Sequence, residues 1–222
     1  MNRRAEMQCG GARAANDNEA LAARRLIGPN ALTQVADALI ARHGSAMASR
    51  TFLRAGLGHR LERRPSDMIP AGEAADLNRA LFELLGEEEA HGVVRQAGAS
   101  LADYLLARRI PAAAQRVFRN APRAFGRALL YAAIAKNAQT FAGGGRFAWR
   151  RVDGADHLTI EDSALTLGFT DAPVPVCGLF AATFEGLLRS LIDPRVRVRE
   201  TRCRAMGGAA STEPLLFLAE RV

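Results

Sequence analysis

Residues 177–211 read CGLFAATFEGLLRSLIDPRVRVRETRCRAMGGAAS, and their pattern predicts a helix, a tight turn and a strand, in that order. Asp193 and Pro194 form the turn, and beyond it Val196 and Val198 alternate with arginines, which is the period of a half-buried strand. The apolar residues before the turn recur at helical spacing and predict one buried face: Leu179, Phe180, Phe184, Leu187, Leu188 and Leu191. We therefore expect the helix to pack back against its strand.

This packing would bring the ends of the helix-strand unit together. Cys177 stands before the helix, while Glu200 and Cys203 lie at the end of the strand, so a carboxylate and two thiols would meet. Zinc sites usually have four N, S or O ligands, and the next donor downstream is the neutral hydroxyl of Ser211. Free cysteines are also common as small, buried apolar residues. The residues alone leave both interpretations open, a zinc site and a structural pair of buried cysteines.

The composition describes a basic chain of 222 residues with a formal net charge of +7. Lys136 is the only lysine, so nearly all the positive charge is arginine, which favours an anionic partner such as a carboxylate, a phosphate or a membrane surface. The arginines are scattered, aromatic residues are sparse, and no zinc-finger or RNA-binding motif is present. The sequence therefore argues against nucleic acid as a partner.

Three cysteines do not make a disulfide framework and indicate a reducing compartment. No apolar run is long enough to span a bilayer, and the basic N-terminus lacks the apolar core of a secretory signal. We therefore expect a cytoplasmic protein. Residues 1–24 are polar and rich in Ala and Gly, which predicts a flexible leader, and residues 25–222 are predicted to form a single domain.

The remaining periodicity predicts helices first and strands afterwards. Asn30 is expected to cap the first helix and Gly98 to break a later one. The expected helices cover residues 30–43, 45–55, 71–86, 87–106, 112–119 and 122–134, with a loop at 60–70. The expected strands cover residues 147–152, 157–160, 165–169, 196–199 and 215–218. This order predicts the α+β class, with a helical N-terminal layer packed on an antiparallel sheet.

Aromatic residues of the helical half and the first strand are the candidates for ligand contacts: Tyr104, Phe118, Phe125, Tyr131, Phe141 and Trp149. A helical aromatic residue more often belongs to the core, so core packing is the alternative for each of them. Arg108 and Arg109 would pair with an acidic ligand group or, alternatively, end a helix as solvated side chains. The sequence contains no nucleotide-binding glycine motif and no nucleophile elbow, so it assigns no catalytic residue.

Three segments and the C-terminal part of the chain together resemble a known family. LIGPNA at 26–31, ADYLLARRIP at 102–111 and TFAGGGRF at 140–147 are similar to the bacteriochlorophyll 4-vinyl reductase proteins of purple bacteria. RVRETRCRAMG at 197–207 resembles the wider vinyl-4-reductase domain family. The resemblance covers residues 26–218, which is nearly everything outside the leader.

The resemblance implies a helical layer over an antiparallel sheet that encloses an apolar ligand pocket. Relatives serve as ligand-sensing domains of phenol- and xylene-responsive activators, and in them a cysteine, a Glu-x-x-Cys motif and a further cysteine hold zinc. By this resemblance Cys177, Glu200 and Cys203 are implied as zinc ligands, and Ser211 stands near the position where those relatives have their last cysteine. It also implies a homodimer.

The resemblance further implies a role in bacteriochlorophyll synthesis, with a magnesium tetrapyrrole as the ligand whose vinyl group is reduced. Hydride transfer needs a carrier such as NADPH or flavin, and the sequence shows neither a nucleotide-binding fingerprint nor an iron–sulfur cysteine set. We therefore expect an accessory protein that binds a divinyl chlorophyll precursor and assists its reduction or its delivery to other enzymes of the synthesis, at the periphery of the photosynthetic membrane. Direct vinyl reduction with NADPH and a small-aromatic sensor module are the alternatives.

Overall fold

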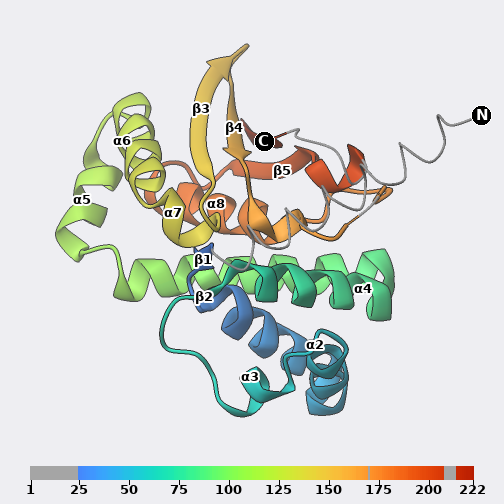
Figure 1. Ribbon diagram of the computed structural model, residues 1–222. Coiled ribbons are helices and arrows are strands. Elements are labelled where there is room, and N and C mark those ends of the chain that lie inside the picture. Colours follow the sequence, from blue (N-terminus) through green and yellow to red (C-terminus); the bar gives the residue numbers. More distant parts are fainter. Residues whose placement is uncertain (1–24, 170, 208–213) are drawn as a thin grey trace, which may run out of the picture.

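The computed structural model describes residues 25–169, 171–207 and 214–222, so the predicted leader at 1–24 lies outside the described residues. Long helices form a layer on one side, a four-stranded sheet forms the other side, and one further helix lies between them (Figure 1). The α+β class predicted from the sequence is confirmed. Within the described part of the chain, no helix is both long and apolar enough to cross a membrane.

The helical layer is built mainly from two long helices, each kinked at a glycine. It comprises β1 (Leu26–Ile27), α2 (Asn30–Arg54), α3 (Gly58–Glu62), β2 (Ile69–Pro70) and α4 (Ala71–Arg108). Gly44 in α2 and Gly86 in α4 have φ values of 81° and 73°, a region that glycine enters without the steric cost that other residues meet. The helix ends predicted at these two glycines are therefore real interruptions, although each helix resumes directly afterwards.

The second half of the chain contributes three shorter helices and the sheet. The helices are α5 (Ala112–Asn120), α6 (Arg123–Lys136) and α7 (Ala138–Phe141). The strands are β3 (Arg146–Val152), β4 (Ala155–Glu161), β5 (Val196–Arg202) and β6 (Leu215–Arg221), in the spatial order β3-β4-β6-β5 with every neighbouring pair antiparallel. The predicted Asp153-Gly154 hairpin joins β3 to β4, and both turn residues have positive φ, as a tight hairpin requires.

Helix α8 (Gly178–Leu191) lies between α4 and the sheet (Figure 1) and is buried along most of its length. All six residues of its predicted apolar face are buried. On the sheet side, the Phe184 ring meets those of Phe147 and Phe217, each with centroids 5.6 Å apart. On the other side, a Cβ at Gly98 of α4 would collide with the Leu179 carbonyl oxygen, so glycine permits the two helices to come this close.

Four local predictions are wrong. Helix α4 continues through Gly98 without a break, because the missing side chain is needed for helix contact and not for a turn. Asn30 is already helical, with Pro29 at the cap position and no side-chain cap. The expected loop at 60–70 contains most of α3 and strand β2. The expected strand at 165–169 begins as the 3-10 helix Ala164–Thr166, because a short apolar run does not by itself distinguish a strand from another buried segment.

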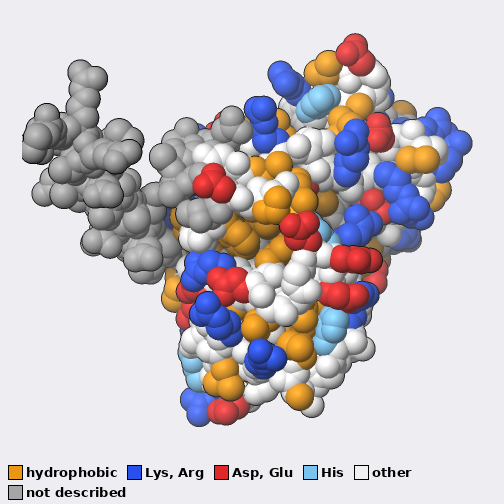
Figure 2. All heavy atoms as spheres, turned by 90° about the vertical axis from the view of Figure 1, so that its right-hand side faces the viewer, with side chains coloured by type: hydrophobic (Ala, Val, Ile, Leu, Met, Phe, Trp, Pro, Cys, Tyr) orange, Lys and Arg blue, Asp and Glu red, His pale blue; other side chains and the backbone are white. Residues whose placement is uncertain are grey.

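One face of the molecule carries side chains of both charges. On the face drawn in Figure 2, acidic and basic side chains are interspersed between patches of apolar ones. This face looks out from the right-hand side of Figure 1, away from α5 and α6.

Candidate metal centre and ligand cavity

Cys177, Glu200 and Cys203 meet at the start of α8. Cys177 occupies the N-cap position of that helix, Glu200 belongs to β5, and Cys203 follows β5 directly. The two sulfur atoms and a carboxylate oxygen all lie within 4.8 Å of one another. The helix-turn-strand pattern of 177–211 therefore predicted a juxtaposition that the structure contains. Ser211, the fourth position suggested by the resemblance, lies outside the described residues.

A register irregularity in β5 lies beside the site. Glu200 pairs with Phe217 and Arg202 pairs with Leu216, so Thr201 is an extra residue in β5, and bulges of this kind redirect neighbouring side chains. The Glu200 carboxylate accepts a hydrogen bond from the backbone N–H of Cys177 at 2.7 Å through Oε2. Its other oxygen, Oε1, is buried without a hydrogen-bond partner among the described residues. Burial raises the pKa of Glu200 well above its usual range.

The pKa values of the two thiols are shifted in opposite directions. A hydrogen bond from the Cys177 side chain lowers the pKa of Cys203 to about 6, and the backbone N–H groups of Val176 and Ala205 act in the same direction. Burial raises the pKa of Cys177 well above that of a free thiol. The hydrogen bond between the two side chains therefore favours ionisation of Cys203 over ionisation of Cys177.

These groups fit a zinc ion. Two cysteine sulfurs and a carboxylate oxygen are donors that zinc accepts, and Glu200 Oε1 is a buried acceptor that lacks a hydrogen bond among the described residues. A bound cation would favour the deprotonated forms of all three groups, which burial disfavours for Cys177 and Glu200. Held by Cys177, Glu200 and Cys203, the ion would connect the start of α8 to the end of β5. Zinc at these three residues remains a prediction.

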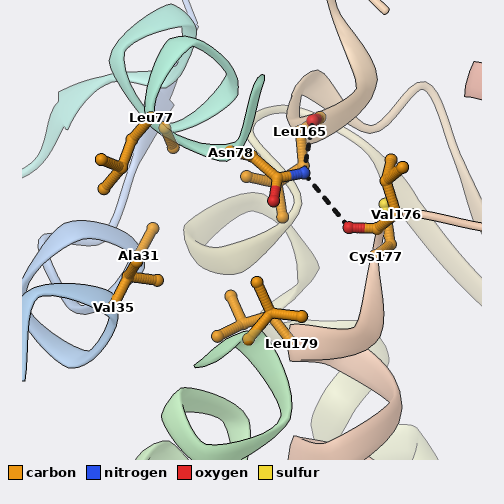
Figure 3. Close-up of a pocket in the computed structure, with 10 residues that line it drawn as sticks. Ala31, Val35, Leu77, Asn78, Leu165, Val176, Cys177 and Leu179 are labelled. Carbon is orange, nitrogen blue, oxygen red and sulfur yellow. Dashed lines mark hydrogen bonds between the residues drawn. The ribbon is translucent and has the colours of Figure 1, made fainter. Parts of the chain in front are cut away.

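A small apolar cavity lies next to Cys177, between α2, α4 and the segment that leads into α8 (Figure 3). Its volume is about 20 Å³, room for about one water molecule. The lining residues are Ala31, Val35, Ala74, Leu77, Asn78, Val94, Leu165, Val176, Cys177 and Leu179. Asn78 stands out in this apolar wall, and its amide donates to the carbonyl oxygens of Val176 at 3.2 Å and Leu165 at 3.5 Å.

The aromatic residues proposed from the sequence as ligand contacts lie away from this cavity. Tyr131 is fully buried and donates its hydroxyl to Asp156 at 3.0 Å, and burial raises the pKa of Tyr131. The Tyr131 ring lies 4.9 Å from that of Trp149, which is partly exposed. Phe141 packs against the Phe180 and Phe184 rings of α8. These three residues therefore already have packing partners in the protein.

The other members of the predicted set are spread over several elements. Tyr104 is half-buried in α4, Phe118 is buried, and Phe125 on α6 is 61% exposed. Arg108 and Arg109 are exposed at the end of α4. The sequence reasoning missed Asn78 as a cavity residue, although one signal was available, a single amide beside the apolar positions Leu77 and Leu81.

Sequence and structure comparisons place this arrangement in a known class. A profile of the V4R domain matches residues 156–211, which include all three candidate metal ligands. The bacteriochlorophyll synthase 23 kDa chain of Cereibacter sphaeroides is 39% identical over 194 residues, covering 86% of this chain and 90% of that protein. The protein of the same name from Rhodobacter capsulatus is 36% identical, covering 86% and 85%. The chain belongs to the V4R-domain family of the bacteriochlorophyll synthase 23 kDa chains.

Solved structures share the fold at low sequence identity. The phenol-responsive sensory domain of the transcription activator PoxR, crystallised with phenol, has a TM-score of 0.51 and 17% identity, covering 69% of this chain and 75% of that one. An H-NOX protein from a study of heme distortion has a TM-score of 0.56 and 12% identity, covering 88% and 95%. At these identities the likeness establishes the fold alone.

Proposed function

We propose that the protein is an accessory component of bacteriochlorophyll biosynthesis that binds a divinyl magnesium tetrapyrrole and assists the reduction of its vinyl group or its delivery to the next enzyme. The observation that carries this proposal is the 39% identity, over nearly the whole chain, to a bacteriochlorophyll synthase 23 kDa chain. The name of that relative supports a role in the synthesis and an association with its other enzymes.

The shared fold supports a flat, apolar ligand. One structural neighbour is described with heme, which is a tetrapyrrole, and another with phenol, a small aromatic molecule. The interior of this chain offers the matching chemistry, since its cavity walls are almost entirely aliphatic. Exposed arginines at the end of α4, Arg108 and Arg109, would suit the carboxylate edge of a pigment.

The cavity must open to accept such a ligand. Ligand pockets for drug-sized molecules typically measure roughly 300–1,000 Å³, whereas this one measures about 20 Å³. Its walls come from α2 and α4 on one side and from Leu165 and residues 176–179 on the other, so binding a tetrapyrrole there would separate these walls. The Asn78 hydrogen bonds to Leu165 and Val176 span them and would break or shift.

An accessory role is favoured over direct catalysis by the sequence. Hydride transfer requires a redox carrier, and the chain contains no G-x-G-x-x-G or other nucleotide-binding fingerprint. The second candidate is vinyl reduction by the protein itself with NADPH. The third is a small-aromatic sensor module, which the fold likeness to the PoxR sensory domain favours.

An absorption titration tests these functions. The full chain is added to magnesium divinyl protochlorophyllide without reductant, and we expect a saturable shift of the pigment bands. NADPH is then added, and we expect no conversion until the other enzymes of the synthesis are supplied. Conversion by the pure protein would establish the reductase instead. Absence of a band shift, together with phenol-dependent stabilisation, would favour the sensor.

A further inference from the structure

Positive charge is concentrated in one continuous part of the chain. Residues 104–152 contain ten of the 30 basic residues and none of the 23 acidic ones. The remaining residues therefore carry a small excess of negative charge, although the whole chain is basic. The basic segment comprises the end of α4, all of α5, α6 and α7, and β3. On the face drawn in Figure 2, acidic and basic side chains are interspersed. In this segment, by contrast, every charged residue is basic.

Several of these cations have no partner among the described residues. Arg123 contacts Asp193, while Arg127 and Arg151 both contact the buried carboxylate of Asp156, so these three arginines have internal partners. Within the described structure, no hydrogen bond or ion pair involves the side chains of five others in the same segment: Arg108, Arg109, Arg116, Lys136 and Arg150. Their charges are available to an external anion.

Exposed apolar side chains occur in the same segment. Five of the large apolar residues that are exposed in the described structure belong to it: Val117, Phe125, Leu129, Trp149 and Val152. Phe125 and Leu129 are 61% and 39% exposed and, four residues apart, share one outer face of α6. The opposite face, with Leu130 and Ile134, is buried in the protein. A surface helix normally presents polar residues to solvent, so α6 has an apolar face without a partner in the described chain.

We propose that this α5–α6 surface, formed by α5 and α6 with the adjoining strand β3, binds an anionic lipid bilayer. The unpaired basic side chains would contact lipid phosphates while Phe125, Leu129 and Val117 enter the headgroup layer, the arrangement of a helix that lies in a membrane interface. Figure 1 shows α5 and α6 at the outer left edge of the molecule, beyond the helical layer, where they can reach a planar surface.

A second copy of the chain fits this surface less well. A two-fold interface places the same patch of each protomer face to face, so arginines would meet arginines with no acidic residue from 104–152 between them. A bilayer that contains acidic lipid supplies the missing negative charge. None of the cavity residues belongs to this surface, and although pigment binding as proposed above would also use Arg108 and Arg109, the variants that test lipid binding leave both of these arginines in place.

Vesicle co-sedimentation tests the proposal. The full chain is mixed with vesicles of phosphatidylcholine alone or with one third phosphatidylglycerol, at low and high salt. We expect binding to the anionic vesicles that weakens as salt screens the charges. Arg116→Gln with Lys136→Gln should lower the partition coefficient about fivefold per residue. Phe125→Ser with Leu129→Ser should lower it by about tenfold or more, since two apolar side chains no longer insert.

The matched control is Arg50→Gln with Leu53→Ser on α2, which removes one exposed arginine and one leucine that is 66% exposed. This variant should sediment like the parent chain. The proposal is overturned if neither kind of vesicle binds the protein, if both bind it equally, or if the control loses as much binding as the α5–α6 variants. A dimer abolished by Phe125→Ser with Leu129→Ser in analytical ultracentrifugation would assign the surface to a second copy instead.

Discussion

Glu200 combines a hydrogen-bonded oxygen, Oε2, with a buried oxygen, Oε1, that has no hydrogen-bond partner in the described residues. A zinc ion would satisfy Oε1 and stabilise the Cys177 and Cys203 thiolates together. We expect about one zinc per chain in protein purified without chelator. Cys203→Ser and Glu200→Gln should lose most of it, and chelation should lower the melting temperature by several degrees, about 2–4 °C per kcal/mol in a chain of this size.

Metal analysis and thermal melting measure both effects. The control is Cys9→Ser, which removes a cysteine outside the described residues and should leave the zinc content unchanged. If the protein holds no zinc and Cys203→Ala keeps the parental melting temperature, the cysteines are only a buried structural pair.

His91 predicts a pH dependence of stability. Its ring packs edge-on against Phe82 with centroids 5.1 Å apart, and burial lowers the pKa of His91 below 6.5, while Glu87 and Arg95 act in opposite directions. Because the unfolded chain then binds the proton more tightly, the contribution of His91 is complete above pH 6.5 and is lost as the pH falls through the folded-state pKa. We expect urea unfolding to show a steeper loss of stability below about pH 6.5 in the parent chain than in His91→Gln. Identical pH profiles would contradict this role.

Among the glycines of α4, Gly92 and Gly98 are not distinguished by the sequence, but their environments differ. A Cβ at Gly98 would collide with the backbone carbonyl of Leu179 and with Ala182, whereas at Gly92 it would meet only the flexible end of Arg42. Gly98→Ala should therefore lower the free energy of unfolding by about 1–3 kcal/mol, as overpacking does. Gly92→Ala should be neutral or stabilising by up to about 1 kcal/mol, because alanine is the better helix former.

Denaturant unfolding of both variants checks this pair. If Gly98→Ala were as stable as Gly92→Ala, α4 and α8 could move apart without loss of folding stability. Close packing against α8 would then not explain why α4 runs unbroken through Gly98.

Element positions could be predicted where periodicity and turn chemistry agree. The apolar spacing of 179–191 and the alternation after Pro194 located α8 and β5, and Asp153-Gly154 located the β3–β4 hairpin. Gly98 was misread because a helical glycine signals a break and a close helix contact alike. The 3-10 helix Ala164–Thr166 was misread because its burial depends on α4, which is distant in sequence.

At the scale of the molecule, the two parts of the candidate site differed in how far the sequence could predict them. The candidate metal centre depends on one local unit, α8 and β5 joined by a tight turn, so spacing alone predicted that Cys177, Glu200 and Cys203 lie together. The cavity is built from α2, α4, the segment before α8, and α8 itself, and no local pattern indicates which faces of these elements meet. The predicted aromatic set therefore fell on other parts of the core and on the surface.

This difference makes the location of the proposed pigment site testable. Val35 is buried in the cavity wall, so Val35→Phe should fill the cavity. In the absorption titration, Val35→Phe should lower the affinity for the pigment at least about tenfold, while Val35→Ala should preserve or raise it. Phe125→Ser, on the exposed face of α6, should leave the shift unchanged. Circular dichroism confirms that each variant is folded before titration.

Hydrogen exchange supplies an independent measurement, because opening the cavity would disturb α2, α4 and residues 176–179 and leave α5 and α6 unchanged. We expect pigment to change amide exchange in the segments that line the cavity. If exchange changes in α5 and α6 instead, and Trp149→Ala or Phe125→Ser weakens the band shift while both Val35 variants keep it, the pigment binds at the aromatic residues predicted from the sequence. The cavity beside Cys177 would then be a packing defect next to the candidate metal centre.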